Sequence, residues 1–491
     1  MKFVKSCRKN PIVHLFNHWR LALLVFLLSC LLWVALRPAV AQTGDYDSVT
    51  WQEPVKLYTS DASVEFPIIL ADDAGRLHLF WNEVVMSTDG LSQSARLFYM
   101  LQENGTWSEP VDVLLRGDGR MDFPRSVIDK YGRLYVVYGG AQEPLGFSQT
   151  DSADAGSAQA WDKATNLTDF GQLGGNIGLA PDGSVHVVYA GLSGDIQHIM
   201  RPLDEPWGDS QSVYTLPTGK AVSSDGPLFA VDNQGGLHVA WSEGKMPLRY
   251  PSTGSFYSYS ADDGETWTQP ISIAPVDQQI FSLLVAENGR IHLFYAGRVG
   301  VGGRYHRWSD DNGRSWSDPQ AIASPTEGTG LSGGDLALDE RGKLHAVMGL
   351  DGDEIIGYSQ WDGTLWNDWV NISADLPGIK ERMSVELVAG NRLFVTWESD
   401  HDSIWYVEGQ LGSPPTPPQD FIPLPTVVPK LEPTAVLADL TPVATDLPDI
   451  PRGQPATTSQ RTVIEALGIG FLAVTGLVGM VFVVQERKRR F

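Results

Sequence analysis

Cysteine is almost missing from this chain of 491 residues, since its only two, Cys7 and Cys30, both lie within residues 1–41. The rest of the chain can form no disulfide and has no thiolate to act as a nucleophile or a metal ligand. Basic residues are also scarce, with 36 Lys and Arg against 59 Asp and Glu and a formal net charge of −23. Such an acidic balance disfavours nucleic acid as a partner and favours solubility outside the cell.

Long apolar runs occur only near the two ends. Residues 1–41 combine six basic residues and no acid with an apolar run at 21–36, and Ala39-Val-Ala41 fits a signal-peptidase site. We therefore expect a signal peptide at 1–41, with an uncleaved anchor as the alternative. Residues 466–484 are uncharged and are followed by four basic residues at 487–490. This pattern predicts a transmembrane helix at 462–485 and a cytoplasmic tail at 486–491.

Proline is concentrated in one segment, because twelve of the 31 prolines lie within residues 412–461. This composition is typical of an extended stalk with polyproline character. The predicted order is therefore a signal peptide, an ectodomain at 42–411, the stalk at 412–461, the transmembrane helix and the tail. We expect a single-pass protein of the cell membrane with its N-terminal head outside and its C-terminus in the cytoplasm.

The ectodomain repeats with a period of roughly fifty residues. An apolar hairpin strand that follows a turn glycine, as in Gly75-Arg-Leu-His-Leu-Phe-Trp81, recurs seven times, and so does a tryptophan strand. The tryptophans are Trp51, Trp107, Trp161, Trp207, Trp267, Trp316 and Trp366. Short strands at this spacing predict an all-β propeller of seven blades, with six as the alternative. Because the first tryptophan strand precedes the first hairpin, we expect residues 49–59 to complete the last blade and close the ring.

Two stretches of the repeat share the pattern S-x-D-x-G-x-[ST]-W. Their matched residues are Ser260, Asp262, Gly264, Thr266 and Trp267, and Ser309, Asp311, Gly313, Ser315 and Trp316. Asp and Ser or Thr can bond to the turn backbone, Gly allows a positive φ, and Trp covers the hairpin. The pattern resembles the Asp-box (BNR) repeat of sialidase-like β-propellers over roughly residues 46–411. We expect these turns to be scaffold on the outer rim.

Histidine recurs at one hairpin position in five blades: His78, His186, His238, His292 and His345. A residue that recurs in every blade has a per-blade packing role, and the ring would hold these side chains apart. We therefore predict no metal site from them and no cofactor.

Candidate ligand-binding residues come from the first strands of the blades, where they meet the mouth of the channel. Aligning these strands gives two polar columns, and the residues selected from or beside them are Glu65, Asp122, Arg125, Asp225, Asp335, Glu381 and Arg382. Such a wet, negatively biased funnel could bind a cation or the hydroxyl groups of a sugar. The alternative is an ordinary solvated channel rim.

The resemblance implies a sialidase site, in which three arginines clamp the substrate carboxylate beside a Tyr/Glu pair and an acid/base Asp. The [FY]-R-I-P strand that carries the first arginine is missing, and the nearest stretches are Glu65-Phe-Pro-Ile68 and Asp122-Phe-Pro-Arg125. Arg125 and Arg382 are candidate inward arginines, with Arg298 or Arg304 as a third. We therefore predict a membrane-anchored propeller that binds a glycan or a cell-surface protein through its channel face, with catalytic residues unknown. The alternative is an exo-glycosidase of sialidase type with a diverged site.

Overall fold

The computed structural model describes residues 45–87, 93–117, 119–140, 143–169, 174–191, 194–223, 226–246, 252–297, 300–339 and 341–423. The predicted signal peptide, transmembrane helix and tail, and most of the predicted stalk, lie outside these residues. Within them, no helix has the length and apolar character needed to span a membrane.

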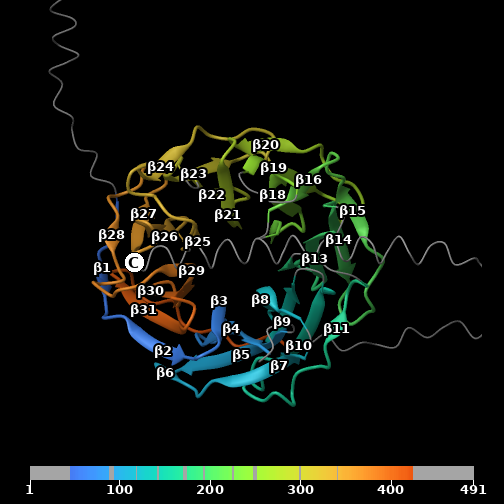
Figure 1. The fold of residues 1–491 in the computed structure, drawn as a ribbon, viewed down its shortest axis with the longest axis horizontal. Coiled ribbons are helices and arrows are strands. Elements are labelled where there is room, and N and C mark those ends of the chain that lie inside the picture. The colour runs from blue at the N-terminus through green and yellow to red at the C-terminus, as the bar shows by residue number, and fades with distance from the viewer. Residues whose placement is uncertain are drawn as a thin grey trace, which may run out of the picture. The chain divides into compact units, whose positions relative to one another are not determined.

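The described residues form seven antiparallel sheets around a central axis, which confirms the seven-bladed propeller over the six-bladed alternative (Figure 1). Blade 1 contains β3 (Ser63–Ala71), β4 (Leu77–Met86), β5 (Gln93–Glu103), β6 (Thr106–Trp107) and β7 (Val111–Arg116), and blade 2 contains β8 (Asp122–Ile128), β9 (Arg133–Gly139), β10 (Gly146–Asp151) and β11 (Thr165–Asn166). Blade 3 contains β12 (Gly175–Leu179), β13 (Val185–Ala190), β14 (Ile196–Arg201) and β15 (Gln211–Tyr214). Blade 4 contains β16 (Lys220–Val222), β17 (Leu228–Val231), β18 (Leu237–Lys245), β19 (Ser252–Ser260) and β20 (Ile271–Ala274).

Blades 5 and 6 contain β21 (Gln278–Val285), β22 (Ile291–Gly297), β23 (Arg304–Ser309) and β24 (Gln320–Ala323), and β25 (Gly334–Leu338), β26 (Leu344–Leu350), β27 (Ile355–Trp361) and β28 (Val370–Asn371). Blade 7 contains β29 (Lys380–Val388), β30 (Arg392–Ser399), β31 (Ser403–Leu411), β1 (Val49–Trp51) and β2 (Val55–Thr59). The innermost strands of neighbouring blades contact one another in ring order, and β29 contacts β3.

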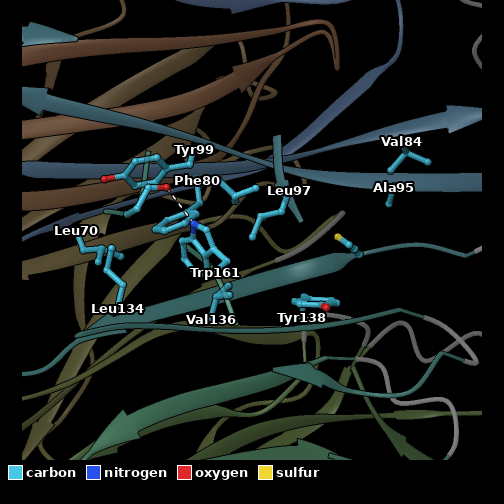
Figure 2. Packing of buried hydrophobic residues seen from close by; sticks show 13 residues of the cluster. Leu70, Phe80, Val84, Ala95, Leu97, Tyr99, Leu134, Val136, Tyr138 and Trp161 are labelled. Carbon is cyan, nitrogen blue, oxygen red and sulfur yellow. Dashed lines mark hydrogen bonds between the residues drawn. The ribbon is translucent and has the colours of Figure 1, made fainter. Parts of the chain in front are cut away.

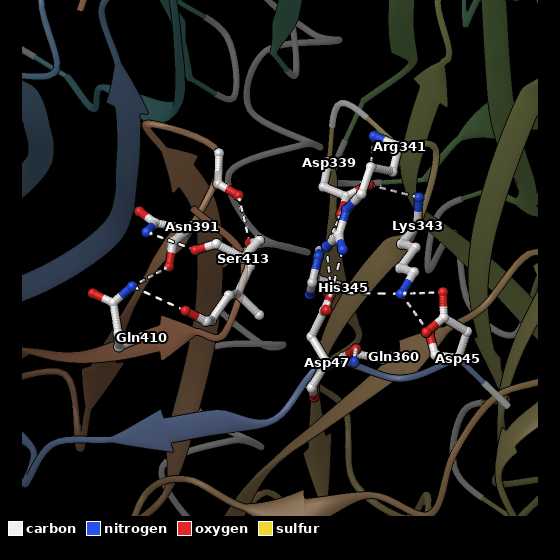
Figure 3. Close-up of polar contacts among 12 residues, drawn as sticks. Asp45, Asp47, Asp339, Arg341, Lys343, His345, Gln360, Asn391, Gln410 and Ser413 are labelled. Atoms are coloured by element: carbon white, nitrogen blue, oxygen red, sulfur yellow. Dashed lines mark hydrogen bonds and ion pairs between the residues drawn. The ribbon is translucent and has the colours of Figure 1, made fainter. Parts of the chain in front are cut away.

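The N-terminal strands close the ring as predicted, because β1 and β2 both pair with β31 in blade 7. Residues before β1 tie this blade to blade 6, where Asp47 pairs with Arg341 and Asp45 lies 3.2 Å from the Nζ atom of Lys343 (Figure 3). The closed ring removes the open sheet edge that an unfinished last blade would expose.

The apolar core lies between blades. In the cluster shown in Figure 2, Phe80 and Tyr99 of blade 1 pack with Leu134, Val136 and Trp161 of blade 2. All five side chains are buried, and the indole nitrogen of Trp161 donates to the carbonyl oxygen of Ala155 at 3.0 Å. Each blade is therefore stabilised chiefly by apolar surface that it shares with its neighbours.

The two S-x-D-x-G-x-[ST]-W turns lie between the third and fourth strands of blades 4 and 5. In the first, Asp262 accepts from the amide of Thr266 at 2.9 Å and from its hydroxyl at 2.6 Å, and Trp267 donates to the carbonyl of Gly264 at 3.1 Å. The second turn has the same bonds, with Asp311 in the place of Asp262. Their side chains are thus used within the turn itself.

The recurring histidines are buried in their own blades. His78, His238 and His345 bond a tyrosine hydroxyl, while His186 and His292 bond a second histidine of the same blade. Their positions in five different sheets keep them apart, as expected for packing residues.

The chain stays on the propeller beyond Leu411, in a segment at 412–423 that we call the strap. Its amides of Thr416, Gln419 and Ile422 donate to carbonyl oxygens of blades 7, 1 and 2 at 2.7, 2.7 and 3.1 Å. These acceptors belong to the turns between first and second strands, and so the strap runs over that face. The start of the segment predicted as a stalk is therefore bound to the head.

Candidate functional site

The innermost strands of three consecutive blades share one irregularity near their start. The register of β29, β3 and β8 shifts after Glu381, Glu65 and Asp122, three members of the first polar column. The next residue in each strand has a positive φ: 53° for Arg382, 57° for Phe66 and 50° for Phe123. A non-glycine residue in this region costs on the order of 1 kcal/mol. Strain repeated at one end of the channel, which we call the mouth, marks a candidate functional site.

The three strained residues meet one another, and we name them the mouth stack. The rings of Phe66 and Phe123 have centroids 4.3 Å apart. The guanidinium carbon of Arg382 lies 4.5 Å from the first centroid and 5.3 Å from the second. Both rings are buried and Arg382 is exposed. Each bulge therefore turns one side chain toward the neighbouring blades, and the guanidinium of Arg382 lies against the two aromatic rings.

A bridge of charges lies beside the mouth stack. Arg120, in the segment before β8, donates to Oε2 of Glu65 and to Oδ1 of Asp122, both at 2.6 Å. Burial lowers the pKa of Arg120, but the two carboxylates more than offset this effect and raise it overall. Burial raises the pKa of Asp122 despite Arg120. The structure thus brings two predicted site residues together through an arginine that the sequence analysis missed.

Blade 7 adds a second charged group at the mouth. Glu398 accepts from the amide of Phe66 at 2.8 Å, and its other oxygen lies 3.0 Å from Nδ1 of His401. Nε2 of His401 lies 3.4 Å from Glu381. The hydrogen bond with Glu398 is the main cause that raises the pKa of His401 to about 9. The imidazole is therefore protonated at neutral pH and links both carboxylates.

Glu381, Glu398 and His401 also have ligand atoms within 4.8 Å of one another, which is close enough to surround a metal ion. A protonated imidazole cannot coordinate a metal, and so binding would require loss of this proton. The ion pairs described above already account for the arrangement.

Further from the mouth, two carboxylates belong to the innermost strands β25 and β29. Asp335 accepts from the amide of Val385 at 3.2 Å, and Glu386 accepts from the amide of Leu387 at 3.1 Å. Burial raises the pKa of Asp335 and raises that of Glu386 to about 8. The amide of Val385 is the main group that lowers the pKa of Asp335 against burial, and the charge of Arg125 adds a smaller effect. Arg125 itself donates to the carbonyl oxygen of Pro124 at 3.1 Å. The structure thus places Arg125 on β8 and Asp335 on β25, the innermost strands of blades 2 and 6.

Three candidate positions do not contribute to the mouth as the structure describes it. Asp225, like Arg298, lies outside the described residues. Arg304 is fully buried, and its guanidinium donates to the carbonyl oxygens of Gly303, Gly328, Thr329 and Ser332 at 2.6–3.1 Å. Its role is to hold a loop, and the suggestion that Arg304 supplies a third substrate-binding arginine is wrong.

No protein-family model and no curated protein sequence matches this chain. Among solved structures, the BP39L lectin from Burkholderia pseudomallei is similar, with 14% identity, a TM-score of 0.53 and coverage of 74% of this chain and all of that one. An ulvan lyase, solved bound to -[GlcA(1-4)Rha3S]-, has 12% identity, a TM-score of 0.51 and coverage of 72% and 95%. A Hadza microbial sialidase is a weaker match, with 15% identity, a TM-score of 0.41 and coverage of 71% and 66%. At such low sequence identity, the similarity to the lectin and to the ulvan lyase shows only that this chain shares their β-propeller fold.

Proposed function

We propose that this chain is a membrane-anchored cell-surface propeller that binds a glycan through the mouth of its channel. The observation that carries the proposal is the mouth stack, in which three strained residues from three blades meet at one point. Arg382 and His401 offer hydrogen-bond donors there, while Glu65, Asp122 and Glu381 offer acceptors. Sugar hydroxyl groups donate and accept at once, and so they suit a surface that presents both kinds of group.

The fold comparison is consistent with this proposal, but the proposal rests on the mouth stack. The names of the lectin and the ulvan lyase indicate that these proteins bind or cleave glycans, and both share the propeller fold with this chain. Membrane anchoring rests on the sequence of residues 1–41 and 462–485 alone.

The path of the strap also supports display of the mouth. The strap follows the turns between first and second strands, which lie at the other end of the channel from the bulges. A stalk that continues from the strap would start on the face opposite the mouth. The described part of the strap, residues 412–423, therefore does not cover the mouth.

The alternative function, a diverged sialidase-type hydrolase, has less support. A carboxylate clamp needs guanidinium groups that converge on one point. Arg382 lies on two aromatic rings, Arg125 donates to the carbonyl oxygen of Pro124, and Arg304 is enclosed by carbonyl oxygens. Arg120 already bonds two carboxylates.

The test is a glycan array probed with a purified head, residues 45–423, together with an assay of fluorogenic sialoside hydrolysis. We expect binding to a subset of glycans, loss of that binding in Arg382→Ala, and no turnover. Arg290→Ala is the matched control, because Arg290 pairs with Asp310 and lies in the turn between β21 and β22, at the end of the blades opposite the mouth. Turnover that Arg382→Ala or Arg125→Ala abolishes would instead establish the hydrolase.

A further inference from the structure

A second hollow lies on the rim, away from the mouth, between blades 2 and 3. It has a volume of about 330 Å³ and is lined by aromatic, charged and hydroxyl side chains. We call it the rim groove and define it by Phe147, Asp162, Lys163, Arg201, Glu205 and Trp207. Its volume falls at the lower end of the range for small-ligand sites, which suits a single sugar ring.

The groove occurs where the repeat breaks. In blade 3, Arg201 lies opposite Val185 in the strand ladder. The equivalent position in blade 4 is occupied by Ser260, which lies opposite Leu237. Arg201 therefore replaces the first serine of the turn motif, and the turn that follows lacks the motif. No hydrogen bond joins the Trp207 indole nitrogen to the described residues, whereas Trp267 is bonded to its own turn.

The walls of the groove are aromatic and meet at a steep angle. Trp207 and Phe147 have ring centroids 5.0 Å apart and planes inclined at 80°. The guanidinium carbon of Arg201 lies 5.3 Å from the first centroid and 5.0 Å from the second. Aromatic faces of this kind pack well against the C–H surface of a sugar ring.

The polar groups of the groove retain unused bonding capacity. Arg201 donates to Oε1 of Gln149 at 2.7 Å, and its buried Nε atom has no acceptor among the described residues. Asp204, the acid of the following turn, pairs instead with Arg133 at 2.8 Å. Burial lowers the pKa of Arg201, which indicates that its surroundings do not fully compensate the charge. Asp162, Lys163 and Glu205 are exposed around it.

The charges of the lining decide between ligand classes. Two acids, Asp162 and Glu205, balance two bases, Lys163 and Arg201. The whole chain carries a net charge of −23, which disfavours approach of a polyanion. A neutral ring that both donates and accepts hydrogen bonds is the best match.

We propose that the rim groove binds a neutral pyranose unit of a glycan, stacked on Trp207 and held by Arg201, Glu205 and Asp162. This would be a second sugar site, independent of the mouth. A purely structural role is the competing explanation, in which the Arg201–Trp207 contact simply replaces the missing turn bonds.

The experiment is saturation-transfer NMR on the full chain carrying Arg382→Ala, so that failure of the mouth proposal does not affect the result. The probes are the methyl glycosides of glucose, galactose, mannose and fucose, with methyl glucuronide as the anionic comparison. We expect at least one neutral glycoside to bind, and Trp207→Ala to weaken it about tenfold. Glu205→Gln, at an exposed position, should weaken it about threefold while the fold is retained.

The matched control is Trp316→Ala, because Trp316 lies under Arg307 in blade 5 as Trp207 lies under Arg201. This variant should lose stability and retain glycoside binding. The proposal is overturned if no neutral glycoside binds at about 10 mM, if binding is unchanged in both Trp207→Ala and Glu205→Gln, or if methyl glucuronide alone binds.

Discussion

At the residue scale, the mouth contains three residues whose backbone conformations are strained. Phe66, Phe123 and Arg382 all have a positive φ, although none is glycine. Packing offsets the cost for the two buried rings. Arg382 is exposed, lies on both rings and also attracts the carboxylates of Asp122 and Glu398. Backbone strain of this kind is common at ligand-binding sites, and we propose that Arg382 contacts the glycan.

This explanation predicts the stability of Arg382→Gly. Glycine accepts φ near 53° without strain, but it also increases the entropy of the unfolded chain, and the two effects are of similar size. We expect the free energy of unfolding to change by less than about 1 kcal/mol in a urea titration. A loss several times larger would mean that Arg382 is chiefly a structural residue.

A second residue-scale prediction concerns pH and His401. Its pKa is raised in the folded protein from 6.5 to about 9, mainly by the hydrogen bond with Glu398. Because the folded pKa is the higher one, the contribution to stability is full below about pH 6.5 and is lost as pH rises through 9. The effect should be small, since the side chain is 54% exposed.

The measurement compares urea unfolding of the wild-type head and of His401→Gln at pH 6 and pH 9.5. The difference in stability between the two proteins should shrink at the higher pH. A constant difference would show that protonation of His401 does not support the mouth.

At the scale of elements, the sequence predicted the sheets well and the mouth only in part. Apolar hairpins and tryptophan strands repeat in each blade, so the count of seven and closure by residues 49–59 followed from spacing alone. The two polar columns come from aligning the first strands on their turn residues, and such an alignment does not reveal a bulge. The polar residues Glu65 and Asp122 were therefore predicted as site residues, whereas Phe66 and Phe123, which the bulges bring together, were not.

Other residues of the mouth could not be predicted from the sequence, because they meet only when the ring closes. Glu398 bonds the amide of Phe66 across 332 positions of sequence, and no local pattern indicates this contact. One usable signal was present, because an acid-Phe-Pro stretch occurs in both β3 and β8. Proline cannot donate to a ladder and is favoured at bulges, which marks both strands as irregular.

The strap supports a prediction of its own. It crosses the turns of blades 7, 1 and 2, and so it spans the junction at which the ring closes. Phe421 adds a contact with Gly132, where a Cβ atom would lie 2.9 Å from the ring. A head that ends at Leu411 should therefore be less stable than one that ends at Pro423, by about 2 kcal/mol.

Differential scanning calorimetry of the two heads provides the check. We expect the shorter head to melt lower by roughly 2–5 °C. Equal melting temperatures would show that the strap only lies on the surface. Gly132→Ala in the longer head should lower its Tm as well, because the substitution forces Phe421 to move and strains a residue whose φ is 85°.

At the scale of the whole molecule, the closed ring holds two separate groups of aromatic and charged side chains. The mouth gathers side chains from blades 7, 1 and 2 on the axis, while the rim groove lies between blades 2 and 3 at the periphery. Two sites on one rigid head would favour ligands that present several sugar units, because the second contact is then intramolecular. A head displayed on a stalk would suit such binding.

The central claim is that the mouth binds a glycan, and calorimetric titration tests it most directly. The ligand is the strongest glycan from the array, and the protein carries Trp207→Ala so that the mouth alone is measured. We predict one site per head and a loss of at least about tenfold in affinity when Arg382→Gly is added. Equal affinity with and without Arg382→Gly would contradict the account and place the ligand elsewhere on the propeller.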